Sequence, residues 1–151
     1  MMGSLEQAIQ QTKFESELLK AHINVLYTAN ILANKQATVL KPFNLTQEQF
    51  NVLRILRGSM PKSMCQKDIL CRMVAPSSNV TLLIKKLVTK KLVHVSQSEI
   101  DRREYVITIT KAGLNTLSAI DIVLEKLKEE LNQLTEAEAK QLNKLLDKIR
   151  R

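Results

Sequence analysis

Four short polar side chains lie within five residues near the middle of the chain, and two lysines follow about one helical turn later. In chain order, these residues are Ser77, Ser78, Asn79, Thr81, Lys85 and Lys86. Hydroxyl and amide side chains can hydrogen bond to base edges, and lysines can contact phosphates. Each residue, taken alone, could instead only cap or solvate a helix. The cluster as a whole favours binding of double-stranded DNA.

Two adjacent arginines, Arg102 and Arg103, form a second group of candidate DNA-binding residues. Arginine side chains are attracted into the narrow minor groove of A·T-rich DNA. Asp101, next to them, can orient one guanidinium through a charge-assisted hydrogen bond. The alternative is a solvated hairpin tip. We favour the DNA contact because the arginines follow a lysine-bearing helix.

The positive charge of the chain is concentrated in one central segment. The formal net charge is +8, and residues 62–103 hold nine lysines and arginines against three acids. The rest of the chain has fourteen basic and twelve acidic residues. A concentrated positive field recruits phosphates and steers association with a polyanion. The composition alone is also compatible with a basic protein that has no such partner.

Histidines and cysteines are too sparse to indicate a catalytic or metal site. The two histidines, His22 and His94, lie far apart in the chain without further ligands at metal-binding spacing. No glycine-rich phosphate loop and no set of serine, histidine and acid stands out. We therefore predict no catalytic residue, no metal, no cofactor and a protein that is not an enzyme.

Cys65 is the one candidate for redox chemistry, because thiols at helix N-termini are more reactive than others. Cys65 and Cys71 are too few for a disulfide framework, and their spacing in one helix turns the side chains apart. Inert structural thiols are the expectation for both.

The composition indicates one domain with an aliphatic core. Hydrophobic residues make up 44% of the 151 residues, whereas aromatic residues make up only 3%. Such a core favours packed helices over a large β-sandwich. The sequence has no long uncharged apolar run and no signal-peptide pattern, so we expect a cytoplasmic protein without a membrane span.

The spacing of apolar residues predicts four helices before the arginine pair. The first is long, with an apolar seam from Phe14 to Leu32, and ends before Pro42. A capping box of Thr46 and Gln49 begins the second, which stops at Gly58 and Pro61. The third begins between residues 63 and 65 and reaches about residue 74. The fourth begins near Pro76, with Val80, Ile84, Leu87 and Val88 buried and Lys85, Lys86, Lys90 and Lys91 exposed.

Beyond residue 92 the apolar residues alternate, which predicts a two-stranded hairpin with Arg102 and Arg103 at its tip. A helix then begins at Thr110 and Lys111, and a last helix follows a capping box of Thr135 and Glu138. Their apolar seams are Leu114, Leu117, Ile120, Leu124, Leu127, Leu131 and Leu134, and then Leu142, Leu145 and Ile149. The predicted fold is mainly α, a winged helix-turn-helix with a two-stranded wing and flanking N- and C-terminal helices.

Several segments resemble regulators of the MarR (multiple antibiotic resistance regulator) type. Residues 45–53 (LTQEQFNVL) resemble the second helix of that family, and residues 80–93 (VTLLIKKLVTKKLV) resemble its recognition helix. Residues 101–103 (DRR) and 109–113 (ITKAG) resemble its wing and the exit from the wing. The resemblance covers roughly residues 40–115, and the wing with its exit is the most specific part.

The resemblance implies a homodimeric transcriptional regulator that binds a pseudo-palindromic operator in double-stranded DNA and is often released by a small ligand. It implies a single domain over residues 1–151, with dimerisation helices at about 5–38 and 114–151 and the winged helix-turn-helix at about 45–110. It also implies a ligand pocket between the dimerisation helices and the winged domain. The candidates to line that pocket are His22, Tyr27 and Phe43.

Two positions depart from the family pattern. Leu82 stands where recognition helices of the family commonly carry a basic residue, and Lys91 stands where they usually have glycine. A helix that ends at Lys91 needs an unusual backbone for lysine or a different termination. These departures leave one alternative open, a helical interaction protein that has lost DNA binding. A second alternative, which rests on Cys65, is a regulator that senses oxidants through this thiol.

Overall fold

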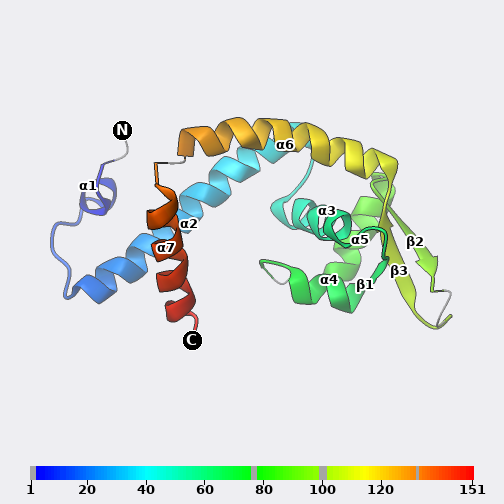
Figure 1. Cartoon of the computed structure of the whole chain (residues 1–151), viewed down its shortest axis with the longest axis horizontal. Helices are drawn as coiled ribbons and strands as arrows, with labels where there is room; N and C mark the ends of the chain where they lie inside the picture. Colours follow the sequence, from blue (N-terminus) through cyan, green and yellow to red (C-terminus); the bar gives the residue numbers. More distant parts are fainter. Residues whose placement is uncertain (1–2, 76–77, 99–101, 132) are drawn as a thin grey trace.

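Two long helices extend from a group of short helices and strands. A computed structural model describes residues 3–75, 78–98, 102–131 and 133–151, without the side chains of residues 130 and 131. The long helices are α2 (Glu17–Leu40) and α6 (Lys111–Leu131), which lie alongside one another as they leave the group (Figure 1). The chain's central segment, residues 47–109, forms the group from which they extend.

Helix α2 confirms the predicted long first helix, although it begins three residues after Phe14. Ser16 caps it, and the Ser16 hydroxyl accepts a hydrogen bond of 3.1 Å from the Leu19 amide. A short helix that was not predicted, α1 (Leu5–Ile9), precedes it. Leu40 is the buried residue of α2, whereas the predicted seam is largely exposed in the single chain, with Leu18, Val25 and Leu32 among its exposed members.

Helix α3 (Gln47–Ser59) is the centre of the core. The predicted capping box is confirmed: the Thr46 hydroxyl accepts from the Gln49 amide, and the Gln49 side chain accepts from the Thr46 amide. A 3-10 turn, η1 (Lys41–Phe43), connects α2 to this helix. The buried hydrophobic residues of α3 are Phe50, Val52, Leu53, Ile55 and Leu56.

Helices α4 (Gln66–Arg72) and α5 (Val80–Thr89) pack against α3 and form the predicted helix-turn-helix. In α5, Ile84 and Leu87 are buried as predicted, and Val80 is half-buried. The prediction for Val88 was wrong, because its side chain is 41% exposed, and Leu83 is buried instead. The seam of α5 is therefore turned by about one residue from the predicted one.

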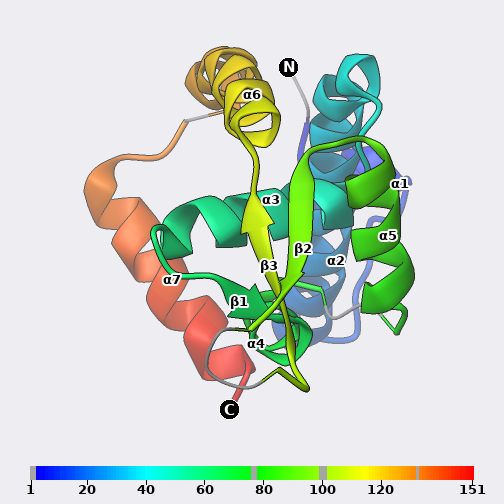
Figure 2. The ribbon, with the colours of Figure 1, turned by 90° about the vertical axis from the view of Figure 1, so that its right-hand side faces the viewer.

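The wing is a hairpin of β2 (Val93–Gln97) and β3 (Tyr105–Ile109), paired from Val93 with Ile109 to Gln97 with Tyr105. A third strand, β1 (Met64–Cys65), pairs with β3 on its other edge and gives the order β1-β3-β2. This strand was not predicted, because two residues are too few for a visible alternation. In Figure 2 the strands β2 and β3 cross in front of α3, and α5 lies beside β2.

Helix α6 begins at the predicted position, directly after the wing. Leu117 and Ile120 of its apolar seam are fully buried against the chain's own core, whereas Ile122 and Val123 are exposed. An ion pair of 2.5 Å between Arg57 and Asp121 joins α3 to α6. The predicted seam residue Leu131 has a side chain outside the described part.

Helix α7 (Glu136–Ile149) follows α6 and runs across its direction, downward in the view of Figure 1. Its predicted capping box of Thr135 and Glu138 is confirmed, and hydrogen bonds from the Thr135 backbone amide and, secondarily, from its hydroxyl lower the pKa of the Glu138 carboxyl. None of the described residues of α7 is buried. Its apolar residues Leu142, Leu145 and Ile149 all face solvent in the single chain.

Candidate nucleic-acid interface

Helix α5 presents its polar face outward because its apolar face packs on the core. Asn79 caps the helix, and its side-chain oxygen accepts a hydrogen bond of 3.0 Å from the Leu82 amide. Lys85 and Lys86 are exposed, as predicted. Residues 62–103, which include α5, hold nine lysines and arginines against three acids, so this segment carries a surplus of positive charge.

A side-chain hydrogen bond holds the first turn of α5 to α4. The Thr81 hydroxyl donates to the Gln66 side-chain oxygen over 2.9 Å, and Gln66 is the first residue of α4. Thr81 is nevertheless exposed. The two helices of the helix-turn-helix are therefore joined where the second of them begins.

The last turn of α5 ends in the backbone form that glycine favours, although Lys91 occupies it. Lys91 has a φ of 60°. The Leu92 amide donates to the Leu87 carbonyl over 3.0 Å, and the Lys91 amide donates to the Val88 carbonyl over 2.8 Å. These two bonds define a Schellman motif, with Leu87 and Leu92 as its apolar pair. The departure at Lys91 is therefore accommodated by an unusual lysine backbone, and the chain passes directly into β2.

Lys90, the C-cap of α5, is half-buried and does not face solvent as the sequence predicted. Its ammonium group donates to the Asn44 carbonyl and, over 2.8 Å, to the Gln49 side-chain oxygen. Burial, and secondarily the charge of Lys86, lowers the pKa of Lys90. Lys90 therefore ties the recognition helix to the loop that follows α2.

The wing ends in a turn that carries both arginines. Arg102 and Arg103 are exposed in the turn between β2 and β3, where the Ser98 amide donates to the Glu104 carbonyl over 2.9 Å. The tip of the wing lies at the same end of the domain as the start of α5 (Figure 2). Its two strands therefore bring the arginine pair to the side of the molecule on which α5 begins.

The predicted DNA-binding residues that the structure describes lie on two elements, α5 with the turn before it and the wing. Ser78, Asn79, Thr81, Lys85 and Lys86 belong to α5 or the turn before it, and Arg102 and Arg103 belong to the wing. Ser77 and Asp101 lie outside the described residues. Sequence reasoning missed Gln66 and the buried role of Lys90, because both act through partners that are distant in the chain.

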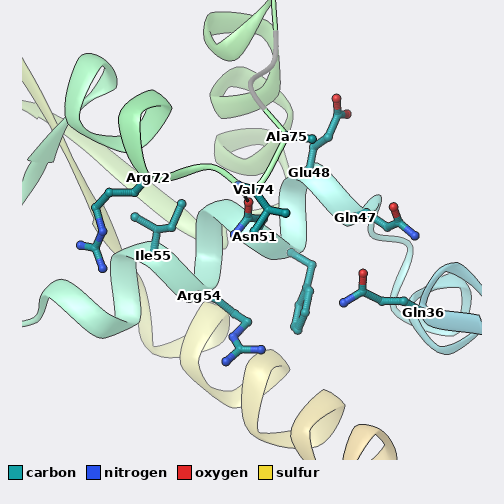
Figure 3. A pocket seen from close by; sticks show the side chains of 10 residues that line it. Gln36, Gln47, Glu48, Asn51, Arg54, Ile55, Arg72, Val74 and Ala75 are labelled. Atoms are coloured by element: carbon teal, nitrogen blue, oxygen red, sulfur yellow. Dashed lines mark hydrogen bonds between the residues drawn. The ribbon is translucent and has the colours of Figure 1, made fainter. Parts of the chain in front are cut away.

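An open cavity of about 550 Å³ lies between α2, α3 and the segment that follows α4. Arg54 and Arg72 line it together with a single acid, Glu48, and Figure 3 shows Gln36 entering from α2. Asn51 closes one side by accepting a hydrogen bond of 2.9 Å from the Val74 amide. The candidate ligand residues His22, Tyr27 and Phe43 do not line this cavity.

The two thiols are free and differ in exposure. Cys65 is half-buried, at the N-cap of α4, and Cys71 is exposed. The backbone of Cys65 pairs with Val106 in the sheet, which gives this residue a structural position. Within the described ranges, histidines, cysteines and acids form no group of three or more that could hold a metal ion. No described helix has the length and apolar character of a membrane span.

Comparison with known proteins, by sequence and by structure, identifies the family that the sequence resembles. The sequence model of the MarR family matches residues 45–105. The uncharacterized HTH-type transcriptional regulator YwoH of Bacillus subtilis is 34% identical over 104 residues, which cover 69% of this chain and 74% of the relative. The HTH-type transcriptional regulator MgrA of Staphylococcus aureus is 29% identical over 126 residues, 82% of this chain and 84% of MgrA.

A solved structure, the MepR-DNA complex of Staphylococcus aureus, superposes with a TM-score of 0.73 at 25% identity. It covers 91% of this chain and 97% of the MepR chain. Residues 45–105, which the family sequence model matches, contain α3, the helix-turn-helix, β2 and the wing turn. These elements position the candidate interface. The chain therefore belongs to the MarR family of transcriptional regulators.

Proposed function

We propose that the chain is a homodimeric regulator of transcription that binds a pseudo-palindromic DNA operator, with α5 in the major groove and the wing beside it. The observation that carries the proposal is that the start of α5 and the tip of the wing lie at the same end of the domain, with exposed lysines on the helix and exposed arginines in the wing turn. Ser78, Asn79 and Thr81 are the candidate base contacts, and Lys85 and Lys86 the candidate phosphate contacts. MepR, a structural relative, has been solved in complex with DNA.

The homodimer is supported by the apolar side chains that one chain leaves in water. Helices α2, α6 and α7 expose Leu18, Leu26, Leu32, Ile122, Leu142, Leu145 and Ile149. Burial of apolar surface releases about 25 cal/mol per Å², so these helices gain by packing against the same helices of a second chain. A two-fold arrangement would set the two α5 helices about 34 Å apart, which matches successive major grooves on one side of DNA.

The cavity in Figure 3 is our candidate site for a small effector. Two arginines against one acid favour an organic anion at this site. The cavity is bounded by α2 on one side and by Val74 and Ala75, which lead toward α5, on the other. A ligand there can change the position of the recognition helix relative to α2.

The proposed function is tested by selection from a random duplex library, followed by binding measurements on the selected site. We expect two chains per duplex, by light scattering of the complex. Ser78→Ala and Asn79→Ala should change discrimination between related sites, because base contacts carry sequence information. Arg102→Ala should weaken all sites, by about 1–3 kcal/mol if the contact is well placed. Failure to select any sequence, or unchanged binding in all three variants, would show that the interface is wrongly assigned.

A further inference from the structure

The first turn of α5 carries an exposed leucine in the middle of its polar face. Leu82 is 45% exposed. Two residues correspond to about 200° of helical rotation, so Leu82 lies on the side of α5 opposite the buried Ile84. Lys85 is its exposed neighbour one turn further along. The side chain of Leu82 therefore points away from the core, among the groups that the sequence assigns to DNA.

The polar neighbours of Leu82 are partly engaged within the protein. The Asn79 side-chain oxygen accepts from the Leu82 amide over 3.0 Å, and the Thr81 hydroxyl donates to Gln66 over 2.9 Å. Both bonds hold the first turn of α5 in place. The same bonds take up an acceptor and a donor that the two side chains would otherwise offer to a base. Leu82 is thus the largest side chain of this turn that is directed outward.

The charge around Leu82 indicates the kind of surface that covers it. Lys85 and Lys86 are exposed on the same helix, which brings this face against a polyanion. Major-groove base edges are polar except at thymine, which presents its C5 methyl group. If Lys85 and Lys86 bind phosphates, Leu82 faces the major groove, where the thymine methyl group is the apolar group that it can contact. A basic side chain at this position would instead favour guanine.

We propose that Leu82 determines operator specificity by contacting the C5 methyl group of a thymine in each half-site. The proposal rests on the proposed function, because it requires α5 to lie in the major groove. Leu82 acts on specificity, and the lysines beside it act on affinity for any sequence.

The test removes only the methyl group. Each thymine of the selected duplex is replaced by deoxyuridine at both symmetric positions, and the dissociation constant is measured by fluorescence anisotropy at fixed salt. At one pair of symmetric positions, we expect the replacement to weaken wild-type binding. The expected loss is about fourfold for each methyl group removed, as loss of one buried methyl group implies. Leu82→Ala should bind the thymine and deoxyuridine duplexes equally. Leu82→Arg should select guanine in place of that thymine.

Val88→Ala is the matched control, because Val88 is 41% exposed on the same helix but lies about 120° around it from Leu82. This variant should keep the full sensitivity to the methyl group. Sensitivity that persists in Leu82→Ala, or its absence at every thymine in the wild type, would overturn the proposal while leaving the proposed function intact. Failure of the wild type to bind any selected duplex would overturn both.

Discussion

The ammonium group of Lys90 donates a hydrogen bond of 2.8 Å to the side-chain oxygen of Gln49. That oxygen also accepts from the Thr46 amide in the capping box of α3, so one amide serves two helices. Gln49 is a buried polar residue, 2% exposed, inside an apolar core. The end of α5 and the beginning of α3 are therefore held by a shared buried acceptor.

Replacement of Lys90 by methionine keeps the length of the side chain and removes its donors. We expect Lys90→Met to lower the free energy of unfolding by about 1–2 kcal/mol, because Gln49 and the Asn44 carbonyl lose a charged donor. Urea denaturation followed by circular dichroism measures this change. Lys86→Met, at an exposed position on the same helix, should change stability by less than about 0.5 kcal/mol. Equal effects of the two substitutions would show that the buried contacts contribute nothing.

Lys91→Gly should stabilise the protein. The left-handed backbone at Lys91, with φ of 60°, costs a lysine about 1 kcal/mol relative to glycine. Thermal unfolding should therefore shift upward by a few degrees. Lys91→Ala is the control, since it removes the same charge and keeps the strain, and it should give no increase. If both variants raised the unfolding temperature alike, loss of charge and not backbone relief would be the cause.

Gly113 lies where the start of α6 touches the end of the wing. A Cβ atom on this residue would come within 2.3 Å of the Leu92 carbonyl oxygen and 2.7 Å of Ile109 Cγ1. We expect Gly113→Ala to destabilise the fold by about 1–3 kcal/mol, as overpacking of a closed site does. Gly58→Ala is the matched control, because the nearest atom, from the flexible Arg72 side chain, lies at 3.8 Å. Similar stability of the two variants, measured by urea denaturation, would contradict the close approach.

The sequence predicted elements whose signals are local. The capping boxes at Thr46 and Thr135, the wing with its arginine pair and the start of α6 all depend on residues a few positions apart. The sequence did not predict features that depend on contacts between residues far apart in the chain. The short strand β1 exists only because β3 pairs with it, and Lys90 is half-buried only because α5 ends beside Gln49.

In the candidate site, too, the sequence predicted the local features and missed those that depend on tertiary contacts. A cluster of polar and basic residues predicts a DNA-binding helix, but only the fold shows that Thr81 is bonded to Gln66 and that Leu82 faces outward. Sequence periodicity placed Val88 in the core, whereas adjacent Leu83 and Ile84 share the buried face of α5. When a short helix has apolar residues on several sides, the periodicity of the sequence does not determine which of them are buried.

The exposed leucines of α7 give a direct test of dimerisation. Leu142→Ser combined with Leu145→Ser should raise the dissociation constant of the dimer by about a hundredfold or more, since each buried leucine contributes about 1.5–3 kcal/mol. Sedimentation analysis over a range of concentrations measures this change. Val74→Ser, at a residue that is 91% exposed and lies outside α2, α6 and α7, should leave the dimer intact. A double variant that kept wild-type self-association would place the interface elsewhere.

The salt dependence of duplex binding tests the central claim most directly. Each phosphate contact contributes about 0.9 to the slope of log K against log salt concentration. If Lys85 makes one such contact in each protomer, Lys85→Gln should reduce the steepness of the wild-type slope by about 1.8. Lys126→Gln, at an exposed position on α6, should leave the slope unchanged. A steep wild-type slope that falls only in Lys85→Gln is the predicted result, and a flat wild-type response would contradict DNA binding through this face.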